Sequence, residues 1–184
     1  MKQESNVMYV IRLALTLLII TSVVAAALAG VNSVTAPVIA RKTQEKTQLA
    51  IQAVLPGGYD REVTDYADST GLVSRVYQGQ QGYAFEVTPA GFDNTITMMV
   101  GVDTAGKVLG ISIISHTETA GLGAVAAMDT PAGQQFRSQF EGASGEVKVT
   151  KDGGTVEAIT GATITSRAIC DGVNAALKCM EALG

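Results

Sequence analysis

One stretch near the N-terminus constrains this chain more than any other, because from Leu13 to Ala40 it contains no charged residue. Its central run, LALTLLIITSVVAAALAGV at residues 13–31, has only Thr16, Thr21 and Ser22 as polar interruptions. A helix of this length spans about 28 Å, close to the hydrocarbon thickness of a bilayer. Hydroxyl side chains can bond to carbonyls of their own helix, so they cost little in lipid. The sequence therefore predicts a short leader over residues 1–9 and a transmembrane helix over residues 10–31.

A cleaved signal peptide is the alternative explanation for this segment. Lys2 and Arg12 give it a positive start, and AAALAG resembles a small-residue cleavage site, which would place a mature N-terminus near Gly30. The apolar run is longer than the usual signal-peptide core of about 7–15 residues, which favours a permanent anchor. Lys and Arg flank both sides, so counting them does not fix the orientation. The short leader favours a cytoplasmic N-terminus and an extracytoplasmic domain.

Composition excludes several functions for the remaining residues. The formal net charge of −4 and the pI near 5.0 leave no basic excess to neutralise phosphates, so no nucleic-acid partner is expected. Cys170 and Cys179, if on one helix, point about 180° apart and lie about 13 Å apart, too far for a disulfide. We expect both to be buried thiols. No His or second Cys pair stands at metal-ligand spacing, so no metal site is predicted.

Turn residues, helix-cap residues and hydrophobic patterning predict the secondary-structure elements that follow the anchor. Residues 32–58 are expected to form a stalk and packing helix, with Thr35 as cap, Pro37 in the first turn and a stop at Pro56. Alternating strand patterns at 72–78 and 83–87 predict one hairpin, and those at 95–103 and 107–115 predict a second. A third hairpin is expected around the KDGG turn at residues 151–154.

Two helical patterns complete the chain. Residues 129–142 are expected to form a helix with Asp129 as its cap, and residues 166–183 place apolar side chains on one face at helical spacing. That face consists of Ile169, Val173, Ala176, Leu177 and Met180. The predicted fold class is α+β: a single N-terminal transmembrane helix, then one domain over residues 59–184 with an antiparallel sheet and packed helices.

The segment SHTETAGLGA at residues 115–124 is the first of two candidate functional segments. It joins His116, the only histidine, to Glu118 and Thr119, followed by Gly121, Leu122 and Gly123. The glycines let backbone approach a ligand closely, and Leu122 could offer it an apolar face. A plain polar turn explains the same residues. No Ser or Cys nucleophile is paired with a base, so hydrolytic chemistry and catalytic side chains are not predicted.

The second such segment is TGATITS at residues 160–166, where hydroxyls gather before a predicted helix. Thr160, Gly161, Ala162 and Thr163 precede the helix, with Thr165 or Ser166 as its cap. A helix start carries unpaired N–H groups and a partial positive charge, which together stabilise a phosphate. The segment lacks the P-loop and dinucleotide-binding patterns. A hydroxyl-rich cap without a ligand explains it equally well.

The same residues resemble a known signature. TGATITS is similar to the flavinylation motif of proteins with a covalently attached FMN, in which a dedicated flavin transferase joins the FMN phosphate to the last threonine of a Ser/Thr-Gly-Ala-Thr tetrad. Thr163 occupies that position here. VNSVTAPVIA at 31–40, MMVGVDTAGKVLGISIISHTETAGLG at 98–123 and the C-terminal helix occur in the family's order. Together they resemble the G subunit of the Rnf complex, a membrane-bound ferredoxin:NAD oxidoreductase that couples electron flow to ion transport.

The resemblance implies a cofactor, partners and a location. FMN would be held through a phosphoester on Thr163, near Thr160, Gly161, Ala162, Thr165 and Ser166, and its ring would lie against Glu118, Thr119, Gly121, Leu122 and Gly123. The chain would be an electron carrier without independent activity, in contact with other Rnf subunits, the transferase and the lipid bilayer. It would sit in the inner membrane as a single-pass protein with its flavin domain on the extracytoplasmic side.

The same sequence features are compatible with two other functions. The C subunit of the sodium-translocating NADH:quinone oxidoreductase shares both motifs but is typically longer. A membrane-tethered binding or scaffold module without redox chemistry would use the tetrad only as a helix cap.

The chain departs from the family pattern at two positions. Glu157 stands three residues before the tetrad, where Asp is usual, and keeps the carboxylate with one more methylene. Ala120 replaces a proline, which frees φ and loosens the loop by up to about 1 kcal/mol of entropy.

Overall fold

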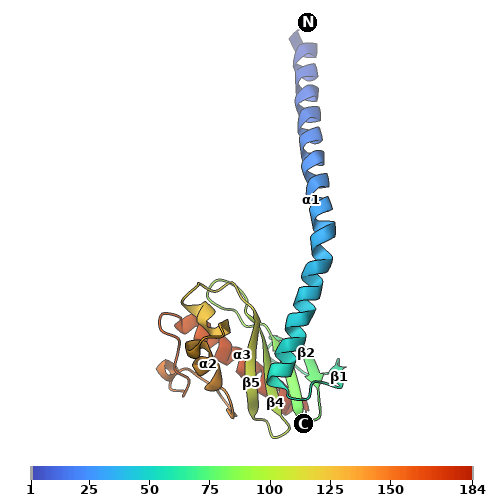
Figure 1. The fold of residues 1–184 in the computed structure, drawn as a ribbon. Coiled ribbons are helices and arrows are strands. Elements are labelled where there is room, and N and C mark those ends of the chain that lie inside the picture. Colours follow the sequence, from blue (N-terminus) through green and yellow to red (C-terminus); the bar gives the residue numbers. More distant parts are fainter. Residues whose placement is uncertain (1, 184) are drawn as a thin grey trace. The chain divides into compact units, whose positions relative to one another are not determined.

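The structure is a computed structural model that describes residues 2–183, with side chains described from residue 7 onward. Figure 1 shows the elements in chain order. The helices are α1 (Lys2–Val54), α2 (Pro131–Ser138) and α3 (Thr163–Leu183), with two short 3₁₀ helices, η1 (Gly123–Ala127) and η2 (Thr150–Asp152). The strands are β1 (Arg61–Val63), β2 (Val73–Gln78), β3 (Gly82–Val87), β4 (Thr97–Asp103) and β5 (Val108–Ser115).

Helix α1 is continuous, so the expected restart at Thr35 was wrong. Thr35 Oγ1 donates back to the carbonyl of Val31 over 3.0 Å, as a hydroxyl does inside a helix rather than at its start. Pro37 lies within the helix rather than in its first turn, and having no N–H it leaves the carbonyl of Ser33 without its helical donor. Contacts along the chain divide it after Glu45 into two compact units.

Within the described residues, one helical stretch, Val7–Val54, is long and apolar enough to cross a membrane. From Val7 to Leu49 its large apolar side chains are more than half exposed, among them Leu17 and Leu28 at 65%. Exposure of so many would be costly in water, whereas lipid solvates them. Thr16 Oγ1 donates to the carbonyl of Arg12 over 2.7 Å and Thr21 Oγ1 to that of Leu17 over 2.9 Å, so these hydroxyls are satisfied within the helix.

The five strands of the described residues form one antiparallel sheet in the order β1-β2-β3-β4-β5. The first two predicted hairpins are confirmed as β2–β3 and β4–β5. Strand β1 was not predicted, because three residues are too few to show an alternating pattern. The sheet and its helices confirm the predicted α+β class.

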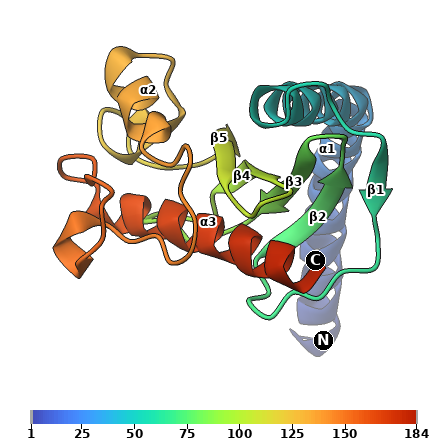
Figure 2. The same cartoon turned by 90° about the horizontal axis from the view of Figure 1, so that it is seen from below.

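Helix α3 covers one face of the sheet, as Figure 2 shows. Phe85 pairs with Val100 and Val100 with Ile111, and these three side chains lie in the same core as α3. All five residues of the predicted apolar face of α3 are buried, which confirms that pattern. On the opposite face, Tyr77, Ala84 and Met99 form a second cluster with the last turns of α1, through Ala50, Ile51 and Val54.

The thiols of Cys170 and Cys179 are buried and free, as predicted. Burial raises the pKa of Cys170 to about 12 and that of Cys179 to about 11. Both therefore serve as small apolar side chains of the core.

The segment before α3 differs from its prediction. Instead of a third hairpin it contains η2 and a single parallel bridge between Val149 and Val156. Asn174 of α3 donates to the carbonyl of Val147 over 2.8 Å and accepts from its N–H over 2.7 Å. Backbone groups that a hairpin would pair with a second strand are thus satisfied by a helix side chain.

Helix α2 begins one residue later than expected. Thr130, not Asp129, is its N-cap, because Thr130 Oγ1 accepts from the N–H of Gly133 over 3.3 Å. Pro131 occupies the first turn as predicted.

Candidate functional site

The site is built around the turn that leads into α3. Gly161 has φ of +76°, a left-handed conformation that other residues adopt at a cost, and the N–H of Ala162 donates to the carbonyl of Ile159 over 2.9 Å. Helix α3 begins at Thr163, so Thr165 and Ser166 lie in its first turn and do not cap it from outside, contrary to expectation. The turn thus presents the half-buried Thr163 at the start of the helix.

The side chain of Ser166 holds the shape of this turn through two hydrogen bonds. Its side chain is fully buried, accepts from the N–H of Ile159 over 3.0 Å and donates to the carbonyl of Ala162 over 2.9 Å. Both hydrogen-bonding functions of the hydroxyl are used within the protein. Ser166 therefore holds the turn rather than facing a ligand.

Glu118 joins three segments of the site. The residue is only 7% exposed; its Oε1 accepts from the N–H of Phe92 over 2.8 Å, and its Oε2 accepts from the hydroxyl of Thr165. Its own N–H donates to Nδ1 of His116 over 3.2 Å, so the sole histidine shapes the same loop. Among the described residues, no group of His, Cys, Asp and Glu could hold a metal ion.

Gly123 allows this close packing. A Cβ built at Gly123 would overlap Oε2 of Glu118 and Oγ1 of Thr165. The glycine is thus required by the approach of two buried polar side chains.

An open pocket of about 300 Å³ lies between the turn and the Glu118 loop. Its apolar rim is formed by Phe92, Leu122 and Ile164, which are 64%, 41% and 50% exposed. Large side chains left open to solvent around a pocket are suited to a planar apolar ligand. The full lining is Phe92, Glu118, Thr119, Leu122, Gly123, Lys151, Gly161, Ala162, Thr163, Ile164 and Thr165.

Most of the residues singled out from the sequence come together in this pocket. Three do not: Ser166 is buried within the first turn of α3, and Gly121 and Thr160 line a neighbouring groove of about 310 Å³, together with Glu157. There the side chain of Gln139 holds the backbone of Glu157, accepting from its N–H over 2.7 Å and donating to its carbonyl over 3.2 Å. The Glu157 side chain is exposed.

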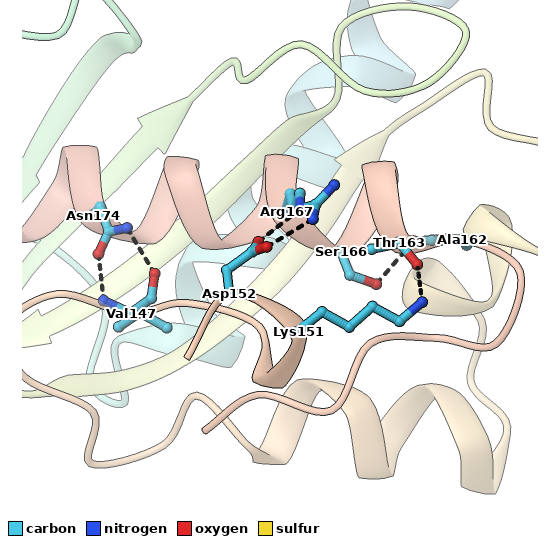
Figure 3. A network of polar contacts seen from close by, with 8 residues as sticks. All are labelled: Val147, Lys151, Asp152, Ala162, Thr163, Ser166, Arg167 and Asn174. Atoms are coloured by element: carbon cyan, nitrogen blue, oxygen red, sulfur yellow. Dashed lines mark hydrogen bonds and ion pairs between the residues drawn. The ribbon is translucent and has the colours of Figure 1, made fainter. Parts of the chain in front are cut away.

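Three residues of the pocket were missed by sequence reasoning: Phe92, Lys151 and Ile164. Lys151 Nζ donates to Oγ1 of Thr163 over 3.1 Å (Figure 3). Its neighbour Asp152 accepts from Nε and Nη2 of Arg167 over 2.6 and 2.7 Å, and this pairing holds the pKa of the Asp152 carboxyl below its usual value. Nothing in the local pattern around residues 92 or 151 announces these contacts, which depend on the fold.

The residues present fit a flavin mononucleotide. A hydroxyl at a helix start, with an ammonium beside it, suits a phosphate, and the apolar rim suits the flavin ring. Residues 91–178 match the FMN-binding domain family, a range that begins at the loop of Phe92 and ends in α3. The fold and site thus define an FMN-binding domain that follows a helix able to span a membrane.

Relatives that match most of the chain define its family more narrowly. It is 32% identical to the G subunit of the Na⁺-translocating ferredoxin:NAD⁺ oxidoreductase complex of Acetobacterium woodii, covering 95% of this chain and 93% of the relative. It is 35% identical to the G subunit of the proton-translocating complex of Clostridium ljungdahlii, over 82% and 80% of the two chains. The G subunit of the ion-translocating oxidoreductase complex of Methanosarcina acetivorans is 29% identical over 93% and 94%. The chain belongs to this family of G subunits and is membrane-associated.

Proposed function

We propose that the chain is the flavin-carrying electron-transfer subunit of a membrane-bound, ion-translocating ferredoxin:NAD oxidoreductase, with FMN held as a phosphoester on Thr163. Thr163 carries the proposal, because this hydroxyl residue lines the pocket at the first position of α3. When bound, FMN supplies reversible electron transfer without a catalytic side chain. No independent catalytic activity is expected of the chain, which would act within the complex.

The chain's own residues would bind and orient the cofactor. The phosphate would lie at the start of α3, and Phe92, Leu122 and Ile164 would shield the ring from water. Glu118 is only 7% exposed and its two carboxylate oxygens are turned to protein donors, so Glu118 would shape the pocket rather than bond the ring directly. Backbone groups of Thr119 and Gly123, which line the pocket, are candidates for contact with the ring.

The proposal includes partners and an orientation. A flavin transferase would attach the FMN, other subunits of the complex would exchange electrons with it, and α1 would anchor the chain in the bilayer. In the proposed orientation the flavin domain lies on the extracytoplasmic side of the membrane. A cysteine placed at the exposed Thr155 tests this, because the two native thiols are buried. A membrane-impermeant maleimide should label this cysteine in intact cells. Labelling only after lysis would contradict the proposed orientation and place the flavin domain in the cytoplasm.

The bound flavin itself has a direct test. The chain purified from membranes of its host should be yellow and should keep flavin fluorescence through a denaturing gel. A colourless chain would instead support a tethered module without redox chemistry. Fluorescence that disappears on denaturation would indicate flavin bound without a covalent bond.

A further inference from the structure

The ammonium group of Lys151 lies at the hydroxyl on which the proposed function depends. Lys151 Nζ donates to Thr163 Oγ1 over 3.1 Å, and the side chain is exposed at the edge of the pocket. Across residues 7–183, no carboxylate forms an ion pair with this lysine. Its ammonium group therefore contacts the hydroxyl and, among the described residues, has no carboxylate within ion-pair distance.

The charged neighbours of Lys151 are engaged elsewhere. Lys148 Nζ pairs with Oε1 of Glu146 over 2.9 Å. Both oxygens of Asp152 are bound to the guanidinium of Arg167. Lys151 is thus distinguished from Lys148, three residues earlier, by contact with the proposed attachment atom.

The fold holds Lys151 at this place. Arg167 lies one helical turn after Thr163, so its pairing with Asp152 fixes η2 against the first turns of α3 (Figure 3). On the other side of η2, the N–H of Thr150 donates to the carbonyl of Val156 over 2.9 Å. Both ends of the short helix are restrained, and its middle residue reaches Thr163.

We propose that Lys151 is a positioning residue for covalent flavin attachment: it orients Thr163 Oγ1 toward the incoming phosphorus and then pairs with the phosphodiester. This inference rests on the proposed function. The lysine donates to Oγ1, so the hydroxyl's own hydrogen is directed away from Lys151. A cation fixed at this atom stabilises the negative charge that develops on the oxygens around phosphorus during transfer.

The chemistry balances with an activated flavin phosphate, such as a flavin dinucleotide held by the transferase. Thr163 Oγ1 forms a bond to the phosphorus of the flavin half, and the pyrophosphate P–O bond breaks. The leaving group is the second mononucleotide of the dinucleotide, which departs with the electrons of that P–O bond. The hydroxyl proton passes to a base of the transferase or to water. Nothing is oxidised or reduced. The product is a phosphodiester with one negative charge beside the Lys151 ammonium.

The test uses the full chain, produced without the transferase, purified in detergent and mixed with purified transferase and flavin dinucleotide. Intact mass followed over time gives kcat and KM for the chain as substrate. Lys151→Met should lower kcat/KM by about tenfold or more, mainly through kcat, because it removes a charge-assisted hydrogen bond. Lys151→Arg should restore the rate to within about threefold of the wild type. The matched control Lys148→Met should stay within about twofold.

Thermal unfolding of each variant separates positioning from stability. Slow incorporation into a Lys151→Met chain that melts with the wild type supports the inference. It is overturned if Lys151→Met is modified at the wild-type rate, if Lys151→Arg is as slow as Lys151→Met, if Lys148→Met slows equally, or if slow incorporation accompanies early melting. A wild-type chain that accepts no FMN would instead overturn covalent attachment itself, and the role of Lys151 with it.

Discussion

The carboxylate of Glu118 accepts a hydrogen bond from the hydroxyl of Thr165, 47 residues further along the chain, and both groups are buried. The second carboxylate oxygen accepts from the N–H of Phe92. One side chain thus connects the loop before β4, the loop after β5 and the first turn of α3. The pocket exists in this form because these three segments are tied at one point.

Removing the Glu118 carboxylate should destabilise the domain. Glu118→Ala leaves the Phe92 N–H and the Thr165 hydroxyl without their partner, which should cost about 2–4 kcal/mol in the free energy of unfolding. Glu118→Gln keeps an acceptor for Phe92 and can donate to Thr165, so it should cost less than about half as much. Urea unfolding of the full chain in detergent, followed by circular dichroism, measures both. A Glu118→Ala chain as stable as the wild type would show that the carboxylate does not connect the segments.

Gly123 should not tolerate even a methyl group. In Gly123→Ala the new Cβ overlaps Glu118 and Thr165, so we expect a loss of about 1–3 kcal/mol and a lower FMN content. Gly110→Ala in β5 is the matched control, because its Cβ meets nothing within 4 Å, and it should change stability by less than about 0.5 kcal/mol. Equal effects of the two substitutions would exclude close packing as the reason for Gly123.

Because both thiols are buried, we expect the domain to lose stability at alkaline pH. The folded-state pKa values of about 12 for Cys170 and about 11 for Cys179 lie above the unfolded value of about 8.5. The unfolded chain therefore releases these protons first, so the contribution of the thiols is complete below about pH 8.5 and is lost as the pH rises toward 12.

Unfolding free energies from pH 8 to 11 test this expectation. The wild type should lose more stability over this range than Cys170→Ala/Cys179→Ala, which lacks both groups. In the folded wild type at pH 8, a thiol reagent such as Ellman's should react with neither cysteine. Rapid reaction of the native chain, or parallel pH profiles, would contradict the assignment of both as core thiols.

Much of the fold could be predicted from the sequence because the signals are local. The apolar run of α1, the alternation in β2 to β5 and the helical spacing from Ile169 to Met180 each reflect the environment of a single element. The prediction of a third hairpin was wrong because the contact that decides this segment is not local. Asn174 on α3 satisfies the backbone at Val147, and no local sequence pattern encodes that contact.

The candidate site was predicted in part. The tetrad and the Glu118 loop were found through their motif, and most of their residues line one pocket. Phe92 meets Glu118 across 26 residues and Lys151 meets Thr163 across 12, so both are recruited by the fold alone. The predicted cap residues Thr165 and Ser166 proved to be buried within the first turn, where they hold the loop and the turn in place.

The most direct test of the account is the mass of the peptide that contains Thr163, taken from the chain isolated from its own host. The account predicts a mass increase equal to one FMN less one water, located on Thr163 by fragmentation. Thr163→Ala should remove it, whereas Thr155→Ala, at an exposed threonine outside the pocket, should not. An unmodified Thr163 in cells that express the transferase, or FMN attached at another residue, would contradict the central claim.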